Sequence, residues 1–325
     1  MKARLFALLF LCLVFTLLFP QYGYPQAEDV AKYPSRPISF IITPPPGASS
    51  DLANRLIIQE AQQFLGQPIV AVNKPGGGFS VGTAAIATAK PDGYTIGCAG
   101  HPAVFAAPHM EKLPYHPVKD FRWIMQFGLQ TLGVTVKNDS PYKSFKDLIS
   151  AAKQNPDKVI YGHTGIGTFA NIIMQQVSKK EGVRFCPMPF KGGTEIVAAL
   201  LGGHITAMTG DVNYSLVEAG QTRLLALIAE TRSSEYPQTP ILKDLGYDIP
   251  VPAVMSVSGP KELPEEIARK LEDAFTKATK EEAFVKGMKA IRFSIVYRNS
   301  KELTEYVSRN YDTYGKFLKE MGLAQ

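Results

Sequence analysis

The stretch PISFIITPPPGASSD, residues 37–51, places an apolar run directly before a proline-rich loop and a helix-start signal. Residues 37–42 are apolar except for one serine, which is typical of a buried strand. Three prolines and Gly47 end that run, and Ser49 and Ser50 favour the start of a helix. The stretch therefore predicts a strand, a loop and a helix in direct succession.

The same succession recurs along the chain. Strands are expected at residues 37–42, 69–72, 94–99, 133–137, 159–162, 184–188, 205–208 and 224–229. Helices are expected at 49–64, 80–89 and 144–154, and from about 168, 194, 264 and 300. Alternation of strands and helices predicts an α/β protein with largely parallel sheets and right-handed crossovers.

Two strand–helix series indicate two α/β units, one nested in the other. We expect an outer lobe of residues 28–134 plus about 251–325 and an inner lobe of residues 135–250. The chain is expected to cross between them near 131–137 and 224–229, where a hinge would lie.

Composition and charge narrow the function classes. The chain has 325 residues, of which 45% are hydrophobic and 20% charged, so a packed core is expected and disorder is not. The formal net charge is +6, but the basic residues are scattered along the sequence. This balance suits small anions, and without a concentrated basic stripe we expect no nucleic-acid partner.

The N-terminus has the form of a secretory signal peptide. Lys2 and Arg4 precede an apolar run from Leu5 to Phe19. That run of about 15 residues is shorter than the roughly 20 that span a bilayer. We expect residues 1–27 to be a cleaved signal and the mature protein to be periplasmic; a retained anchor is the alternative.

Export leaves Cys98 and Cys186 in the mature chain. A disulfide between them is possible in an oxidising compartment. The alternative is that both are small apolar residues at strand ends.

The loop after the first strand is a candidate anion site. In open α/β sheets, ligands bind beyond the carboxyl ends of the strands. A helix N-terminus there offers free N–H groups and partial positive charge. The candidate ligand-binding residues are Pro46, Gly47, Ala48, Ser49 and Ser50. Asp51 would repel an anion, so it is expected to cap the helix or complement its dipole.

A glycine-rich loop at residues 162–168, GHTGIGT, repeats this design in the inner unit. It lacks the G-x-G-x-x-G spacing of dinucleotide-binding loops and the lysine of a P-loop. The candidate residues in this loop are Thr164, Gly165, Ile166, Gly167 and Thr168. Their N–H groups and hydroxyls are suited to holding a carboxylate.

Further candidates follow other strands. Lys191 either supplies charge to the cleft or is simply solvated. Asp211 either accepts a hydrogen bond from a ligand amine or hydroxyl, or caps the next helix. Gly100 and His101 close the third strand, where His101 contacts ligand or is a surface histidine.

The motifs of enzymes and metal sites are missing. The five histidines show no metal-ligand spacing, and the sequence has no G-x-S-x-G elbow. We therefore expect no metal, no cofactor and no catalytic residue. An exported α/β enzyme remains the alternative from another class.

A series of short motifs carries a family resemblance. They are Tyr33-Pro-Ser-Arg-Pro-Ile38, the Pro-Pro-Gly…Asp loop ending at Asp51, Leu65-Gly-Gln-Pro68, Asn73-Lys-Pro-Gly76, Lys90-Pro-Asp-Gly-Tyr-Thr95, Asp120-Phe121, Gly165-Ile-Gly167, Phe190-Lys-Gly-Gly193 and Leu201-Gly-Gly203. Over residues 33–320 the chain resembles the periplasmic solute receptors of tripartite tricarboxylate transporters, the Bug family.

The resemblance implies a two-lobed periplasmic-binding-protein fold of the Venus-flytrap, type II-like kind, with a ligand cleft between the lobes. It also implies a small organic carboxylate held by backbone amides and waters at loops that match Pro46–Ser50 and Thr164–Thr168. The expected partner is a separate membrane permease; a sensor kinase is the alternative. We expect the receptor to be a monomer.

The chain departs from the family pattern in places. Family members usually carry glycine at Ala48, histidine and glutamate at Asn171 and Gln175, and tyrosine at Phe190. The departures at Ala48 and Phe190 predict a ligand less polar than citrate.

Overall fold

The structure is a computed structural model that describes residues 30–233, 235–249 and 253–324. The chain divides into two compact units, residues 1–33 and 34–325. The described part of the first unit contains η1 (Val30–Lys32). The expected signal peptide, residues 1–27, lies outside the described residues.

The second unit alternates strands and helices along most of its length. Its elements are β1 (Ile38–Ile42), α2 (Ser49–Leu65), β2 (Ile69–Asn73), η2 (Gly77–Phe79), α3 (Ser80–Ala87), β3 (Thr95–Cys98), α4 (His101–Phe105), α5 (Ala107–Met110), β4 (Phe121–Leu129), β5 (Leu132–Lys137), α6 (Phe145–Gln154), β6 (Ile160–His163), α7 (Phe169–Glu181), β7 (Cys186–Pro189), α8 (Gly193–Leu201), β8 (Ala207–Asp211), α9 (Tyr214–Glu218), β9 (Thr222–Ile228), η3 (Leu242–Leu245), β10 (Val254–Pro260), α10 (Glu265–Ala278), α11 (Glu282–Ala290) and α12 (Ser300–Glu320).

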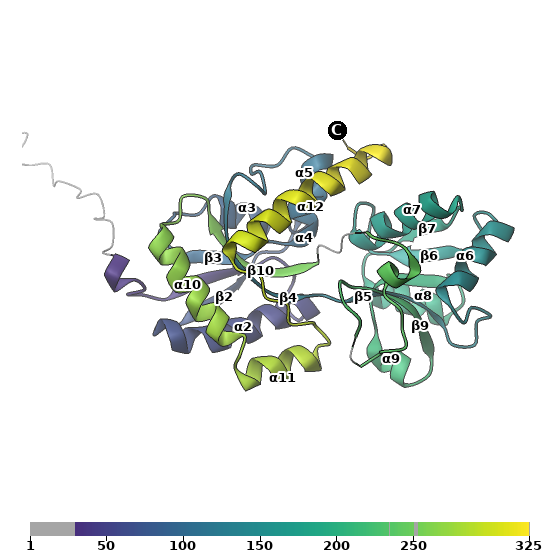
Figure 1. Ribbon diagram of the computed structural model, residues 1–325, viewed down its shortest axis with the longest axis horizontal. Helices are drawn as coiled ribbons and strands as arrows, with labels where there is room; N and C mark the ends of the chain where they lie inside the picture. The colour runs from purple at the N-terminus through teal and green to yellow at the C-terminus, as the bar shows by residue number, and fades with distance from the viewer. Residues whose placement is uncertain (1–29, 234, 250–252, 325) are drawn as a thin grey trace, which may run out of the picture. The chain divides into compact units, whose positions relative to one another are not determined.

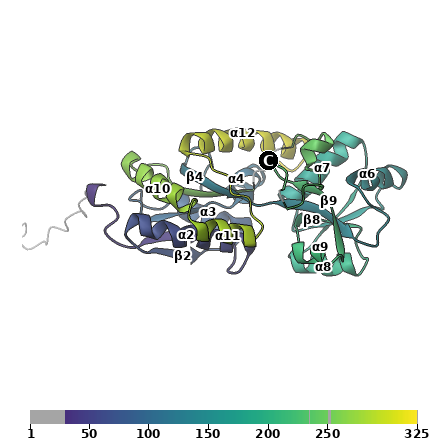
Figure 2. The ribbon, with the colours of Figure 1, turned by 60° about the horizontal axis from the view of Figure 1, so that its bottom comes forward.

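Two five-stranded sheets organise this unit, and helices flank each sheet on both sides (Figures 1 and 2). The first sheet has the order β2-β1-β3-β10-β4, and the second has the order β7-β6-β8-β5-β9. In each sheet three neighbouring strands are parallel, and a fourth strand, β10 in the first sheet and β5 in the second, is antiparallel to both of its neighbours. We call the elements around the first sheet the first lobe and those around the second sheet the second lobe. The α/β two-lobed fold expected from the sequence is confirmed.

The chain passes between the sheets at two places. It leaves the first sheet at Gln130–Thr131, between β4 and β5, and returns between η3 and β10. The crossing predicted near 224–229 is wrong, because those residues form β9 inside the second sheet. β5 begins at Leu132, so residues 132–134 belong to the second sheet.

The core explains why the strands form where they do. β4 and β10 are buried along almost their whole length, including the polar side chains of Gln126, Ser256 and Ser258. Helix α10 packs on α2 and β4, and α12 packs on β4. In the second lobe, α7 buries Ile172, Ile173 and Met174 completely, so its first turns belong to the core.

Cys98 and Cys186 are both free, so the alternative of a disulfide between them does not hold. Cys98 is buried on β3 in the first sheet, and Cys186 lies on β7 in the second. Burial raises the pKa of the Cys98 thiol to about 11, which keeps it protonated and unreactive.

Within the described ranges, we find no helix that combines the length and the apolar character needed to cross a membrane.

The packing of α10 predicts a position-dependent loss of stability. Leu271 in α10 is completely buried, whereas Leu52 in α2 is 41% exposed. Leu271→Ala should lower the free energy of unfolding by about 2–5 kcal/mol, because it leaves a cavity. The matched change Leu52→Ala should cost less than about 1 kcal/mol. Urea denaturation followed by circular dichroism measures both, and equal losses would contradict this description of the core.

Candidate functional site

The first candidate loop, residues 43–48, joins β1 to α2 at the carboxyl edge of the first sheet. Gly47 has a φ of 83°, in the left-handed region that favours glycine. Ala48 is the N-cap of α2 and offers no side-chain cap bond. The first N–H groups of the helix, including those of Ser49 and Ser50, therefore have no partner within the helix.

Asp51 holds this loop in shape. Its carboxylate is only 1% exposed and accepts hydrogen bonds from Gly47 N–H at 2.9 Å, Arg55 Nε at 3.0 Å and Asn73 Nδ2 at 2.8 Å. Burial alone would raise the pKa of Asp51, but the hydrogen bonds from Arg55, Asn73 and Gly47 outweigh it and keep the pKa below its ordinary value. Asp51 therefore braces the loop from behind and has no free oxygen for a ligand.

The second candidate loop, residues 164–168, joins β6 to α7. Buried His163 braces it, because its Nδ1 lies 3.1 Å from Gly165 N and 2.8 Å from Gly165 O. Burial lowers the pKa of His163, so the ring is neutral near pH 7. The Thr168 hydroxyl donates to Gly165 O at 2.7 Å, so it closes the loop and does not cap α7.

His101 joins the two lobes through an aromatic stack. Its ring lies 4.7 Å from the ring of Phe169, the first residue of α7, and 6.2 Å edge-on from Phe79. Desolvation lowers the pKa of His101 to about 3, so it is a neutral ring in this contact. Gly100 leaves room for Phe79, since a Cβ there would lie 2.4 Å from that side chain. His101 is therefore a contact between the lobes, unlike the surface histidine that was the alternative.

Asp211 and Lys191 lie at the carboxyl ends of β8 and β7. Asp211 is exposed to solvent, and its Oδ1 accepts a hydrogen bond of 2.5 Å from Gln130 Nε2. Crowding by protein raises the pKa of Asp211, and the bond from Gln130 lowers it in part. Lys191 is exposed, and its backbone N–H donates to Glu195.

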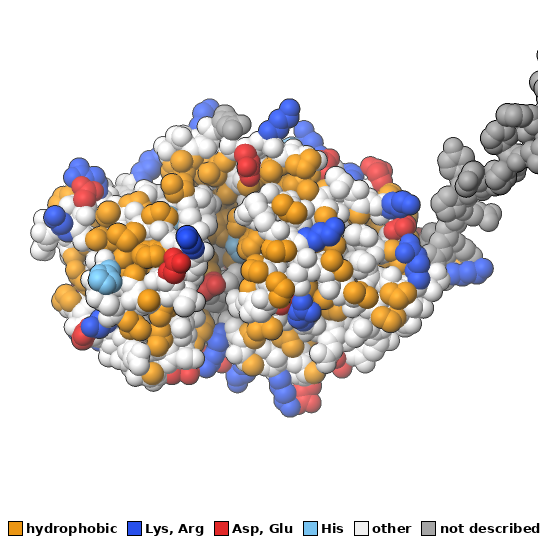
Figure 3. All heavy atoms as spheres, turned by 180° about the vertical axis from the view of Figure 1, so that it is seen from behind, with side chains coloured by type: hydrophobic (Ala, Val, Ile, Leu, Met, Phe, Trp, Pro, Cys, Tyr) orange, Lys and Arg blue, Asp and Glu red, His pale blue; other side chains and the backbone are white. Residues whose placement is uncertain are grey.

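The structure gathers the predicted residues into two groups. Pro46–Ser50, Gly100 and His101 leave neighbouring strands of the first sheet at one edge. Thr164–Thr168, Lys191 and Asp211 do the same in the second sheet. The stack of His101 on Phe169 and the bond from Gln130 to Asp211 link the groups. Figure 3 shows the surface hollowed between the lobes.

Sequence reasoning missed three contributors, Phe79, Gln130 and Phe169. Phe79 had a local signal in the sequence, because it directly follows three glycines. In the structure it adopts a left-handed φ of 78°. Gln130 and Phe169 had no local signal, since their roles depend on partners far away in the sequence.

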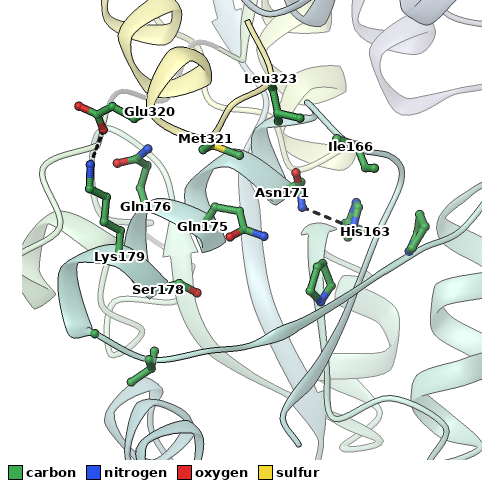
Figure 4. Close-up of a pocket in the computed structure, with 14 residues that line it drawn as sticks. His163, Ile166, Asn171, Gln175, Gln176, Ser178, Lys179, Glu320, Met321 and Leu323 are labelled. Atoms are coloured by element: carbon green, nitrogen blue, oxygen red, sulfur yellow. Dashed lines mark hydrogen bonds and ion pairs between the residues drawn. The ribbon is translucent and has the colours of Figure 1, made fainter. Parts of the chain in front are cut away.

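A cavity of about 600 Å³ opens beside α7 and the end of α12 (Figure 4). Its wall includes His163, Asn171, Gln175 and Met321. Of the predicted site residues only Ile166 lines it, so this cavity lies behind the second loop. No group of His, Cys, Asp or Glu suited to a metal ion occurs among the residues that the structure describes.

The strand orders and loops are those of a periplasmic binding protein, and solved structures agree. A TctC solute-binding protein from Polaromonas superposes with a TM-score of 0.78 at 27% identity, covering 89% of this chain and 99% of that one. Two Rhodopseudomonas palustris proteins share the fold, with TM-scores of 0.72 and 0.75 and identities of 22% and 23%. They cover 88% and 90% of this chain, and 100% and 99% of their own. The first, MatC, holds malate and the second holds adipate.

The family model of the tripartite tricarboxylate transporter family receptor matches residues 53–323. A Cupriavidus necator protein, described as a UPF0065 protein in the gbd 5' region, is 32% identical over 302 residues, which is 93% of this chain and 92% of that protein. The chain therefore belongs to the tripartite tricarboxylate transporter receptor family, as the resemblance predicted.

The bracing role of Asp51 predicts a specific pH dependence of stability. Its folded pKa lies below the unfolded value of about 3.9, so its contribution is present above that pH and is lost as pH falls through the folded pKa. Asp51→Asn should cost about 1–3 kcal/mol at pH 7, and the gap to wild type should narrow below pH 4.

Thermal unfolding from pH 7 to pH 2.5 measures this gap. Asp273→Asn on the surface of α10, whose carboxylate is 64% exposed, is the matched control and should change little. A gap for Asp51→Asn that stays constant down to pH 2.5 would contradict the brace.

Proposed function

We propose that this protein is a periplasmic receptor that binds a small organic acid at the two braced loops and delivers it to a membrane permease of the tripartite type. One observation carries the proposal. Helices α2 and α7 each begin at the carboxyl end of a parallel strand without a side-chain cap bond. Each lobe thus contributes one helix N-terminus to the candidate site.

The chemistry of these loops suits a carboxylate. Uncapped N–H groups donate hydrogen bonds, and the helix dipole places partial positive charge beside them. Asp51 and His163 already fix the loop backbones, so little ordering accompanies binding. Ser49 and Ser50 add hydroxyl groups, and Thr164 is exposed beside Gly165.

Closure of the lobes completes the proposed cycle. Ligand held by both loops would favour the closed arrangement, in which the stack of His101 on Phe169 covers one side. The closed receptor would then engage the permease as a monomer. The malate and adipate held by the Rhodopseudomonas palustris proteins of this fold are consistent with an acid ligand, and the family whose model matches is one of transporter receptors.

A thermal-shift screen with mono-, di- and tricarboxylates tests the ligand class. An acid at about 100 times its Kd adds roughly 2.7 kcal/mol, which should raise the Tm by several degrees. If no acid shifts the Tm, the proposed ligand class is wrong.

A charge variant tests the second loop. Gly165 has a φ of 139°, and an added Cβ meets only Thr168 at 3.7 Å, so Gly165→Asp and Gly165→Asn share the same backbone strain. They differ in charge, and Asp should bind the acid at least about tenfold more weakly than Asn. Isothermal titration calorimetry measures both. Equal affinities would remove this loop from the site.

A further inference from the structure

Asp211 lies at the edge of the second sheet where its parallel strands end and the following loops begin. It is the last residue of β8, which runs parallel to β6 with Tyr161 opposite Ala207 and Gly162 opposite Met208. The carboxyl ends of parallel neighbours meet at one edge, so Asp211 ends β8 at the edge where the second candidate loop leaves β6. Gly210, with a φ of 138°, shapes the end of the strand before it.

The contacts of Asp211 leave it able to accept further hydrogen bonds. Its Oδ1 accepts from Gln130 Nε2 at 2.5 Å. Within the described part of the chain, no lysine or arginine pairs with the carboxylate, and its side chain is exposed. The carboxyl group thus has one oxygen, Oδ2, for which the described part of the chain supplies no partner, while desolvation raises its pKa.

Gln130 fixes the direction of Asp211. It lies in the passage from the first to the second sheet, is 7% exposed, and its own N–H donates to Ala253 O at 3.0 Å. Ala253 lies in the segment by which the chain returns to the first sheet. Gln130 is therefore fixed by both segments that connect the sheets, and its side-chain amide in turn fixes Asp211. A buried donor of this kind keeps one carboxyl oxygen oriented and leaves the other for a further hydrogen bond.

The capping alternative for Asp211 does not hold. Helix α9 starts at Tyr214, and its N-cap is Asn213, whose side chain accepts from Leu216 N–H at 3.2 Å. Asp211 is therefore not needed to begin the next helix.

We propose that Asp211 selects the ligand, by accepting a hydrogen bond from a hydroxyl or ammonium group that the acid carries besides its carboxylate. This inference rests on the proposed function. The loops attract one carboxylate, whereas Asp211 repels a second one. The ligand class is then a hydroxy or amino monocarboxylic acid, and not a di- or tricarboxylate.

Matched acids test this selection by isothermal titration calorimetry. One series is propionate, lactate and alanine, and the other is butyrate, 4-hydroxybutyrate and 4-aminobutyrate, with succinate added. In at least one series the hydroxyl or ammonium member should bind at least about tenfold more tightly than the unsubstituted acid. Succinate should bind more weakly than that member. The two members of a series distinguish a hydroxyl ligand from an ammonium ligand.

Variants at Asp211 assign the preference to this residue. Asp211→Ala should bring the ratio of affinities close to one and raise the affinity for succinate. Asp211→Asn keeps an oxygen for Gln130 and places an NH2 group toward the ligand, from which a hydroxyl oxygen can accept but to which an ammonium cannot donate, so it should retain a hydroxyl preference and lose an ammonium preference. Asp139→Asn, at a carboxylate that is 70% exposed after β5, is the control and should leave every ratio unchanged.

The outcomes separate this inference from the function on which it rests. If the wild type binds acids without preference, or if the preference survives in folded Asp211→Ala, the selection by Asp211 is overturned and the proposed function still stands. Binding of no acid at all overturns the proposed function. A preference that disappears in Asp211→Ala, with Asp211→Asn confirming that the protein folds, supports the selection.

Discussion

Parallel strands send the chain out at one edge of a sheet, and each following helix begins there with N–H groups that have no partner. Both sheets obey this constraint, because β1, β2 and β3 are parallel neighbours in the first sheet and β6, β7 and β8 in the second. The candidate residues lie in the loops after these strands. A negatively charged group is the natural complement of two such helix starts.

Side chains behind the two loops hold the loop backbone in position, and backbone N–H groups at the helix starts remain available to a ligand. Asp51 uses its carboxylate to hold Gly47, and His163 uses its ring to hold Gly165. The strongest polar groups near the helix starts are therefore already engaged. The groups that remain to bind a ligand are backbone N–H groups and hydroxyls. Such groups can hold an anion although no lysine or arginine side chain is part of either loop. Asp211 is the exception, because Gln130 engages one of its carboxyl oxygens and no lysine or arginine of the described residues pairs with it.

The sequence predicted these loops because their signals are local. An apolar run, prolines or glycines and a helix start occur within about 15 residues in each lobe. β4 and β10 escaped prediction because polar residues that are buried in the structure, Gln126 in β4 and Ser256 and Ser258 in β10, interrupt their apolar runs. The prediction of a crossing at 224–229 failed because an apolar run does not show which sheet a strand joins. This run is β9, which lies inside the second sheet.

Contacts across the lobes could not be predicted from local patterns. Gln130 and Asp211 are 81 residues apart, and the role of His101 depends on Phe169 in the other lobe. Such pairs exist only because the chain crosses between the sheets and returns. The sequence therefore predicted which loops form the candidate site, whereas the groups that link the lobes needed the structure.

The most direct test of two helix starts converging on one ligand is a crystal structure of the protein with a bound acid, read for the position of its carboxylate. We predict that the carboxylate oxygens accept hydrogen bonds from the N–H groups at the helix starts that the loops themselves do not use, those of Ser49 and Ser50 and of Ile166 and Phe169, directly or through one water. An acid bound in the cavity beside α7, with both loops empty, would contradict the account.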